Sequence, residues 1–401
     1  MKVLVLNCGS SSVKYKLYDM GGGGVLGQGG VEKVGMRGSF LKLTLSGGEK
    51  KVLEKDLPEH TAAIEFILSM LVDGEVGCVK RLDEIEAVGH RVVHGGEWFG
   101  ASVEINAEVK ARLVECIDMA PLHNPPNLKG IEAMEKLLPG VRQVAVFDTA
   151  FHQTMPSYAY MYGLPYFCYE KYGIRRYGFH GTSHRYVSRR ACEYLSLPYE
   201  HQRIITAHIG NGGSVTAIEK GKSVDTSMGL TPVEGLLMGT RCGDVDAGAL
   251  TLLMEKEGLD YKSLSEVLNR QSGVLGLSGV SSDMRDIDAA IQGGHARAKL
   301  ALEVYNYRIR KYVGAYTAVL GGCDILVFTG GVGENQWSTR QAVCEKMEYM
   351  GMKLDVEKNK SVQGTEAVIS EAGSKVSIVV IPTDEELTIA TDTLTIIEKS
   401  K

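Results

Sequence analysis

Two arginines stand in settings where an enzyme that handles phosphate or carboxylate groups would need them. Arg91 lies in VGHRVVHGG and Arg241 in MGTRCGDVD, and the surrounding glycines would let a ligand approach either guanidinium group closely. The fork of N–H donors on arginine matches the oxygens of a carboxylate or phosphate, and positive charge there stabilises a phosphoryl group in transit. A solvated surface side chain or a simple ion pair is the alternative for each arginine.

Two carboxylates follow apolar strands. Asp148 ends VRQVAVFD, and Glu385 lies in IPTDEELTIA, directly after another apolar run. In an α/β protein the carboxyl ends of strands border the ligand crevice, where a carboxylate can hold Mg²⁺ through water or orient a nucleophile. Acids in TDEE are also typical of a helix start, where the helix dipole favours them. Both interpretations of Glu385 can hold together.

Two histidines, His180 and His184, lie four residues apart in YGFHGTSHRY. This spacing occurs in zinc sites on helices, but no third ligand is evident, and Gly181 with Thr182 predicts a loop that enters a helix. A histidine that faces a transferring phosphoryl group is the favoured interpretation. The motifs HExxH and GxSxG are absent, so the sequence does not support a zinc protease or an α/β-hydrolase.

Three turns rich in glycine or serine could bind phosphate through backbone N–H groups. The first, LNCGSSSVK, contains Ser10, Ser12 and Lys14, and the second is HIGNGGSVT, residues 208–216. The third, TGGVGEN at residues 329–335, follows a strand and precedes a helical stretch, as anion sites at helix N-termini do. Each turn alone could also be an ordinary hairpin or a point of close helix–strand packing.

Short apolar runs alternate with segments of helical periodicity, which predicts an α/β fold. The predicted strands are residues 2–6, 13–18, 41–45, 85–89, 141–147, 203–208, 214–219, 325–329 and 376–381. The predicted helices are residues 61–71, 106–116, 126–138, 185–195, 247–256, 295–321 and 339–350. No Rossmann fingerprint follows the first strand, and KGKS at residues 220–223 has Thr216 where a Walker A motif requires glycine.

The first two turns resemble each other and suggest an internal repeat. Residues 6–14 align without gaps with residues 208–216, and each half later has an apolar strand that ends in glycine. A chain of 401 residues exceeds one typical core, so we predict two copies of one α/β unit. The predicted domains are residues 1–150 and 151–385, and the C-terminal helix, residues 386–401, is predicted to pack back on the first domain.

The composition is that of a soluble protein that acts on small molecules. Hydrophobic residues make up 44% and charged residues 23% of the chain, with a net charge of −5 and no basic block, so nucleic acid is not an expected partner. No apolar run is long enough for a membrane span or a signal peptide. The 8 cysteines are scattered without a CxxC pair, which predicts reduced thiols and a cytoplasmic protein.

A series of motifs closely resembles the acetate kinase family in order and spacing, over nearly the whole chain. The motifs are NCGSSSVK, HRVVHGG, FDTAFH, RYGFHGTSH, AHIGNGGS, GLTPVEGLLMGTRCGDVD, FTGGVGEN and PTDEE. Because that family belongs to the sugar kinases and actin-like ATPases, the resemblance implies two duplicated actin-like (ribonuclease H-like) domains with a nucleotide cleft between them. It also implies the reaction ATP + acetate ⇌ ADP + acetyl phosphate by direct in-line transfer, with Mg²⁺ or Mn²⁺, in a homodimer.

The resemblance implies roles for single residues of this chain. The implied catalytic residues are Arg91, Asp148, His180 and Arg241. The implied metal site is Asn7 with Glu385, and the implied acetate site is Arg91 with the apolar set Val93, Leu122, Phe179 and Pro232. The implied nucleotide and phosphate contacts are Ser10, Ser12, Lys14, His208, Ile209, Gly210, Asn211, Gly212, Asp283, Met284, Arg285, Gly331, Val332, Gly333, Glu334 and Asn335.

One residue departs from the family pattern. PTNEE is common where this chain has Asp384, which adds a charge beside Glu385 and bears on metal affinity more than on reaction type. The family usually gives Asp148 a role in proton transfer. Because acetate is already ionised at neutral pH, we expect Asp148 instead to orient neighbouring groups or metal-bound water.

Other functions remain open on the sequence alone. A propionate kinase differs by pocket volume, and branched Val93 predicts a preference for acetate without exclusion of propionate. A non-metabolic actin-like ATPase would share the phosphate turns but would not need Arg91 and Arg241. A sugar kinase would need a larger polar pocket, against which Phe179 argues. Dimerisation is predicted in the second domain, on the helical region 295–321, with core packing as the alternative.

Overall fold

The computed structural model of the chain describes residues 1–45 and 48–399. The chain divides into two compact units, and the first of them is discontinuous in sequence. Unit 1 comprises Met1–Gln153 and Asp384–Lys401, and unit 2 comprises Thr154–Thr383. The nucleotide-binding and dimerisation roles given to the second domain stay predictions.

Unit 1 is built on a sheet with the strand order β5-β4-β3-β2-β1-β6-β8-β7. The strands are β1 Lys2–Cys8, β2 Ser12–Asp19, β3 Gly24–Glu32, β4 Phe40–Thr44, β5 Lys50–Glu54, β6 Ala87–Val92, β7 Val103–Glu104 and β8 Arg142–Phe147. The central strands are apolar on both faces because helices cover both, as in other parallel sheets. Val3, Leu4, Val5 and Leu6 of β1 are accordingly all buried.

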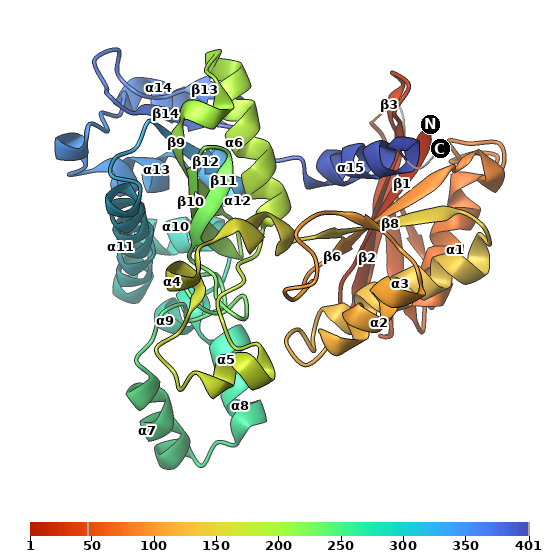
Figure 1. The fold of residues 1–401 in the computed structure, drawn as a ribbon, viewed down its shortest axis with the longest axis horizontal. Helices are drawn as coiled ribbons and strands as arrows, with labels where there is room; N and C mark the ends of the chain where they lie inside the picture. Colours follow the sequence, from red (N-terminus) through yellow and green to blue (C-terminus); the bar gives the residue numbers. More distant parts are fainter. Residues whose placement is uncertain (46–47, 400–401) are drawn as a thin grey trace. The chain divides into compact units, whose positions relative to one another are not determined.

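Different helices pack on the two faces of this sheet. The helices of unit 1 are α1 His60–Leu71, α2 Ala107–Glu115, α3 Asn124–Leu137 and α15 Glu385–Lys399. Helices α1 and α3 pack on the face that Leu4 and Leu6 present. Helix α15 packs on the opposite face, where Ile389 and Ile397 contact the layer of Val3. Figure 1 shows α15, drawn in blue, lying along the sheet whose first strand is drawn in red.

Unit 2 has a smaller sheet with the order β11-β10-β9-β12-β14-β13. Its strands are β9 Arg203–Ile209, β10 Gly213–Glu219, β11 Lys222–Thr226, β12 Ile325–Thr329, β13 Ala367–Val368 and β14 Ser377–Val380. Its helices are α4 Ser157–Tyr160, α5 Phe167–Tyr172, α6 Gly181–Leu195, α7 Ala247–Glu257, α8 Tyr261–Glu266, α9 Gly273–Ser278, α10 Met284–Gln292, α11 Ala296–Val319, α12 Gly330–Asn335, α13 Trp337–Cys344 and α14 Val356–Ser361. Helix α11 is the longest of these and contacts β9, β10 and α13.

The same topology occurs in both units. In unit 1 an antiparallel hairpin, β1–β2, is followed by the parallel strands β6 and β8 beside β1. In unit 2 the hairpin β9–β10 is followed by the parallel strands β12 and β14 beside β9. This mixed α/β arrangement with two sheets confirms the predicted fold of two duplicated actin-like domains.

The two hairpins differ in one detail that the gapless alignment of the sequence does not allow for. Cys8 pairs with Val13 across the first turn, whereas Ile209 pairs with Gly213 across the second. The first turn is therefore one residue longer. A one-residue slip moves side chains to the opposite face of a strand, so only one strand of each hairpin can be matched without a gap.

The predicted elements agree best with the buried strands and long helices. Strands β3, β5, β7, β11 and β13 and several short helices were not predicted; in β3 the sequence GVLGQGGVE has a weak strand pattern because its glycines lack side chains. The helix predicted at 339–350 is α13 followed by a separate 3₁₀ turn at Glu348–Met350. Helix α15 begins at Glu385, which therefore lies in unit 1, and residues 400–401 of the predicted C-terminal helix lie outside the described residues.

Two further predictions concern membranes and thiols. In the described parts of the chain, the helices all lack the length or the apolar character that crossing a membrane requires. The cysteines are all free. Burial raises the pKa of Cys8, Cys116, Cys323 and Cys344 to about 12, so these thiols are protonated at neutral pH.

Candidate active site

The β1–β2 turn is held by contacts to its carbonyl groups. Asn127 Nδ2 of α3 donates to the Cys8 carbonyl at 2.9 Å, and His60 Nε2 of α1 lies 2.7 Å from the Gly9 carbonyl oxygen. The Ser11 carbonyl accepts from the Val34 N–H at 2.9 Å. These contacts fix the peptide planes of the turn, which is the requirement for a backbone anion site.

Cys8 and Ser11 have structural roles that the sequence does not reveal. The Cys8 side chain is buried on α3 at Gly130, where a Cβ atom would clash with its sulfur. Ser11 contributes its carbonyl to the anchor just described. Neither side chain is needed for the proposed phosphate contacts, which leaves those to Ser10, Ser12 and the backbone.

Arg91 and Asp148 form a two-bond fork at the ends of the parallel strands β6 and β8. Arg91 Nε donates to Asp148 Oδ1 at 3.0 Å, and Arg91 Nη2 donates to Oδ2 at 2.7 Å. Asp148 is 2% exposed, and its backbone N–H bonds to the Val92 carbonyl at 3.0 Å. A guanidinium group has five N–H donors, so the fork leaves an edge of Arg91 that can bind a carboxylate or phosphoryl oxygen.

Glu385 lies next to this fork, at the first residue of α15. Its Oε2 is 4.0 Å from Arg91 Nε, and its side chain keeps 20% of its exposure. Burial raises the pKa of Glu385 to about 7, opposed by the charge of Arg91 and reinforced by the charges of Asp148 and Glu386. The group is thus poised between its acid and its carboxylate at neutral pH, and a bound cation would favour the carboxylate.

The Asp384 side chain caps the start of α15. Its Oδ1 accepts from the Leu387 N–H at 3.0 Å, which is a helix-capping bond, and lies 3.7 Å from Lys16 Nζ and 3.4 Å from the Tyr18 hydroxyl. The extra charge beside Glu385 is therefore balanced by Lys16. The helix-start interpretation of the TDEE motif is confirmed at Asp384, and the role of Glu385 in a site stays a prediction.

The donor set of unit 1 suits magnesium better than zinc. Asn7, Lys14 and Glu386 line one cavity of about 240 Å³ over β1–β4. Among the described residues, no three His, Cys, Asp or Glu side chains gather as a metal cage. Mg²⁺ typically takes one or two carboxylates and otherwise waters and substrate phosphates, so the amide of Asn7 and a carboxylate from the start of α15 are donor types that suit such an ion; Glu386, not Glu385, is the one that lines this cavity.

His180 in unit 2 has an unusual backbone. It precedes α6 with φ of 55° and ψ of 22°, the left-handed region that costs energy for a residue with a side chain. Strain of this kind is concentrated at functional sites. The sequence predicted a loop that enters a helix near Gly181, and the structure confirms it.

A chain of hydrogen bonds runs from His180 into the core. His180 Nδ1 lies 2.9 Å from Ser214 Oγ, which lies 2.7 Å from His184 Nε2. His184 Nδ1 lies 2.7 Å from Thr206 Oγ1, and Ser214, His184 and Thr206 are fully buried. Because the Ser214 hydroxyl has one proton, it donates to one histidine and accepts from the other, so both histidines carry their proton on the same ring nitrogen. His184 is thus a partner of His180 and not a second metal ligand.

His180 and Arg241 face the same glycine in the β9–β10 turn. A Cβ atom at Gly212 would lie 3.2 Å from Arg241 Nη1 and 3.7 Å from His180 Nε2. The Arg241 Nη1 also donates to the Pro232 carbonyl at 3.4 Å. The absence of a side chain at Gly212 therefore keeps open the space that the Arg241 guanidinium group and the His180 ring border. The His180 ring stacks on His208, with centroids 4.3 Å apart.

A cavity of about 650 Å³ opens beyond this turn and is large enough for a nucleotide. It is lined by Gly210, Asn211, Gly239, Ser282, Asp283, Met284, Arg285, Asp288, Gly331, Val332, Asn335, Gln336 and Gln363. Eight of these were among the predicted nucleotide contacts, and Gly239, Ser282, Asp288, Gln336 and Gln363 were not. Glycine-rich turns can be recognised from the sequence alone. The five residues that were missed line the cavity without belonging to any recognisable sequence motif.

Glu334 of the third glycine turn serves the fold. Its Oε1 accepts from the Gly330 N–H at 2.8 Å and the Thr383 N–H at 3.1 Å, and lies 3.3 Å from Thr329 Oγ1. The carboxylate thereby fastens the turn to the last residue of unit 2.

The apolar residues predicted for the acetate methyl are divided between the units. Val93 is buried in unit 1 and its N–H bonds to Asn127 Oδ1 at 3.0 Å, while Leu122 is 47% exposed. Phe179 is buried in unit 2, next to His180 in the sequence, and Pro232 is partly buried. Their joint use as a pocket stays a prediction.

Comparisons with known proteins identify the relatives of this chain. The model of the acetokinase family matches residues 2–391. The acetate kinase of Parabacteroides distasonis is 69% identical over 399 residues, and that of Phocaeicola vulgatus is 65% identical over 399 residues, both over the full length of each chain.

Solved structures show the same relationship. The acetate kinase of Porphyromonas gingivalis superposes with a TM-score of 0.95 at 65% identity and covers 99% of each chain. A propionate kinase from Francisella tularensis superposes with a TM-score of 0.92 at 41% identity, covering 98% of this chain and 99% of its own.

Proposed function

This chain belongs to the acetokinase family, and from that premise we propose that it transfers the γ-phosphoryl group of ATP reversibly to acetate, with Mg²⁺, to give acetyl phosphate and ADP. Membership of the family makes the chain a phosphotransferase with a carboxyl group as acceptor. The observation that carries the proposal is the fork between Arg91 and Asp148, because it presents an oriented guanidinium edge suited to a carboxylate.

Arg91 is the proposed acetate-binding residue, and Asp148 is the residue that orients it. Both Asp148 oxygens are engaged by Arg91, which favours an orienting role over proton transfer. Acetate is ionised at neutral pH and is already a nucleophile, so it needs alignment and relief from phosphoryl repulsion rather than deprotonation.

His180 and Arg241 are proposed to stabilise the charge on the phosphoryl group as it moves directly, in line, to acetate. If Ser214 donates to His180 Nδ1, then His180 carries its proton on Nε2, the ring nitrogen that lies near Gly212 beside Arg241. Two donors aimed at one small space are the arrangement that electrostatic stabilisation of a transition state needs.

Asn7 and Glu385 are the residues that would hold Mg²⁺ or Mn²⁺. The bound ion would screen the negative charge of the ATP phosphates during transfer. Ser10, Ser12 and Lys14 would bind phosphate, and the 650 Å³ cavity would hold the nucleoside. These assignments rest on the donor types and on the cavity.

Formation of acetyl phosphate tests the proposal directly. We expect hydroxamate from hydroxylamine trapping when the protein is given ATP, Mg²⁺ and acetate. ATP hydrolysis without hydroxamate would favour the actin-like ATPase instead. A kcat/KM for propionate above that for acetate would favour a propionate kinase, a relevant alternative because the Francisella tularensis propionate kinase shares this fold.

We also propose a homodimer that uses α11. Leu300 is 51% exposed and Tyr307 is 59% exposed, and their spacing of two helical turns places both on one side of the helix. Sedimentation should give the mass of two chains, and Tyr307→Asp should lower it to one. Retention of the dimer in that variant would move the interface elsewhere.

A further inference from the structure

Arg241 lies on a long irregular segment, whose conformation depends on contacts with the rest of unit 2 because it has no regular secondary structure of its own. Residues 227–246 connect β11 to α7 without a helix or strand among them. Long connections of this kind are uncommon in compact domains and are usually functional. The segment is nevertheless packed, with Met228, Leu236 and Met238 all buried.

The segment closes into a loop at a neck between Gly235 and Asp244. The Gly235 N–H donates to Asp244 Oδ1 at 2.9 Å, and the Asp244 N–H donates to the Gly235 carbonyl at 2.9 Å. Gly235 has φ of 107° and Gly243 has φ of 68°, so glycine permits the close approach on both sides. Arg241 lies inside the closed loop, three positions before Asp244.

The second oxygen of Asp244 is held by the long helix α11. The Tyr312 hydroxyl donates to Asp244 Oδ2 at 2.7 Å. Burial and the charge of Asp244 raise the pKa of Tyr312, so the phenol stays protonated and remains a donor. The carboxylate is thereby fixed from two directions, by the loop and by the scaffold.

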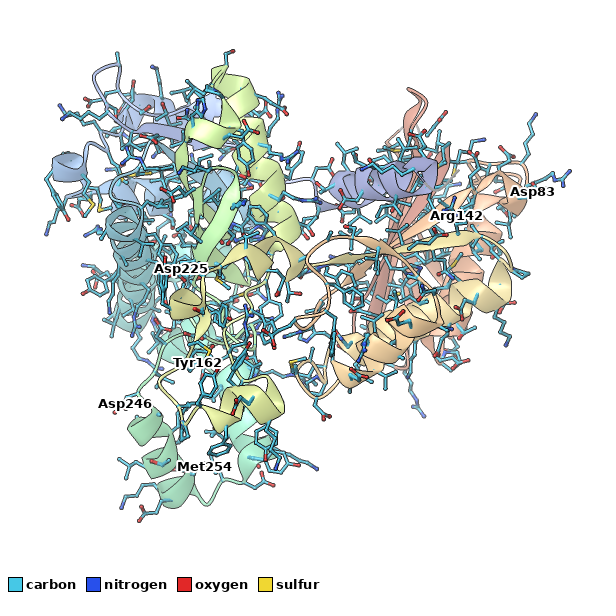
Figure 2. The ribbon with its side chains drawn as sticks, viewed as in Figure 1. Asp83, Arg142, Tyr162, Asp225, Asp246 and Met254 are labelled. Atoms are coloured by element: carbon cyan, nitrogen blue, oxygen red, sulfur yellow. The ribbon has the colours of Figure 1, made fainter. Side chains whose placement is uncertain are left out.

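The preceding part of the segment has its own separate anchor. Arg176 Nη2 donates to Glu234 Oε1 at 2.5 Å and Arg176 Nη1 donates to Asp225 Oδ1 at 3.2 Å, while the Tyr162 hydroxyl bonds to the other Glu234 oxygen. Tyr162 and Asp225, both labelled in Figure 2, belong to unit 2. This anchor supports the entry to the loop. Within the loop, the Cys242 N–H donates to the Leu268 carbonyl at 3.1 Å and Thr240 Oγ1 donates to the Asn269 carbonyl at 2.8 Å, and the neck at Asp244 closes its return.

We propose that Asp244, oriented by Tyr312, is a positioning residue that holds the loop so that Arg241 faces the phosphoryl group. The inference rests on the proposed function for the role of Arg241. It assigns a function to two residues that touch neither the substrate site nor the nucleotide cavity as described above. It predicts that the hydroxyl of Tyr312 matters for kcat although it is remote from the chemistry.

Removal of that single hydroxyl is the test. Tyr312→Phe should lower kcat for acetyl phosphate formation about 5- to 20-fold, because a small displacement of a catalytic group has effects of this order. Tyr305→Phe is the matched control, since Tyr305 lies on the same helix and its buried hydroxyl has no hydrogen-bond partner among the described residues. Equal kcat values for the two variants would overturn the proposal.

A double-mutant cycle shows whether the effect passes through Arg241. In an Arg241→Lys background, Tyr312→Phe should lower kcat less than twofold further. The same 5- to 20-fold loss in both backgrounds would overturn the proposal. Asp244→Asn should keep most of the activity because the amide oxygen can accept from Gly235 and its N–H can reach Tyr312, whereas Asp244→Ala should not.

Amide hydrogen exchange separates this inference from the proposed function. Tyr312→Phe should raise exchange at the Gly235 and Asp244 N–H groups at least tenfold, with no change at α6. Unchanged exchange would refute the neck. Faster exchange together with full activity of Arg241→Lys would instead refute the catalytic role of Arg241.

Discussion

The two units share one topology, but their candidate residues stand at different places in it and make different kinds of contact. In unit 1, Arg91, Asp148 and Glu385 form a charged group at the strand ends of β6 and β8 and the start of α15. In unit 2, His180 and Ser214 begin a chain of side-chain hydrogen bonds beside Arg241, and glycine turns border the cavity. A duplicated fold therefore does not dictate where the candidate residues stand in each copy or what chemistry they have.

The difference fits the ligands proposed above for the two units. A fork of ion pairs can fix a guanidinium edge for a small carboxylate, whereas a polyphosphate is bound better by backbone N–H groups that carry no mobile charge. Ion pairs are broken by loss of one partner, which leaves the other charge buried. Loss of one member of a hydrogen-bond chain leaves no buried charge, and the remaining histidines can respond by a change of tautomer. The predictions below separate these behaviours.

The largest effect is expected at the fork of unit 1. Arg91→Lys should lower kcat/KM for acetate about 10³-fold, because lysine keeps the charge but cannot make the two-bond fork and bind acetate as well. Arg142→Lys is the control: Arg142, labelled in Figure 2, makes a similar fork with Glu104 at 2.7 and 2.6 Å in the same unit. The control should stay within twofold, and a loss at Arg91 no larger than at Arg142 would contradict the comparison.

A smaller loss is expected from Asp148→Asn. The amide replaces one accepting oxygen by a donor, so one bond of the fork to Arg91 is lost and kcat should fall about 10²-fold. The measurement is kcat for acetate at pH 8, where acetate is fully ionised. If proton transfer were the only role of Asp148, this rate would barely change.

A moderate loss is expected from Ser214→Ala in unit 2. Without the hydroxyl, nothing couples the tautomer of His180 to that of His184, and kcat should fall about 10- to 50-fold. Nitrogen-15 shifts of the His180 ring should show a mixture of tautomers in place of one. Ser188→Ala is the control, because that buried serine on α6 bonds to Arg185 and Tyr199 instead; a similar loss there would contradict the prediction.

The smallest effect concerns stability and pH. Because the pKa of Glu385 is raised to about 7 when folded, the folded protein binds more protons than the unfolded chain between pH 4.5 and 7, and stability is lost as pH rises through that window. Glu385→Gln should therefore stabilise the metal-free protein by roughly 1–3 kcal/mol at pH 8 and very little at pH 4.5. Denaturant unfolding at both pH values measures this, and an equal effect at both would contradict it.

The sequence predicted the parts of the fold that local patterns encode. The apolar runs at residues 2–6 and 203–208 became β1 and β9, and the serines and glycines after them marked the two hairpin turns. Weak strands such as β3 escaped prediction because glycine contributes no side-chain pattern. Arg91 and Asp148 each lie at the end of a predicted strand. Two such positions are expected to be close together when the strands are parallel neighbours, because the carboxyl ends of such strands lie at the same edge of the sheet.

What the sequence could not predict is pairing across long separations. The bonds of Asn127 to Cys8 and of Tyr312 to Asp244 join residues whose meeting is decided by tertiary packing. For the same reason the sequence did not show that the Glu334 carboxylate bonds to Gly330 and Thr383, while its predicted nucleotide contact stays a prediction. Local residue types indicate a kind of site, and packing decides which side chains support it.

The return of α15 to unit 1 has a consequence for how the chain is made. The layer that contains Val3 and Ala87 is covered by Ile389 and Ile397, which follow all of unit 2 in the sequence. Unit 2 is continuous in sequence and is fully synthesised once Thr383 has been translated. The sheet of unit 1, which starts at β1, is covered on both faces only after α15 has been synthesised as well. The first unit to be translated is therefore the last that can finish folding, and loss of the final helix should expose the apolar face of its sheet to aggregation.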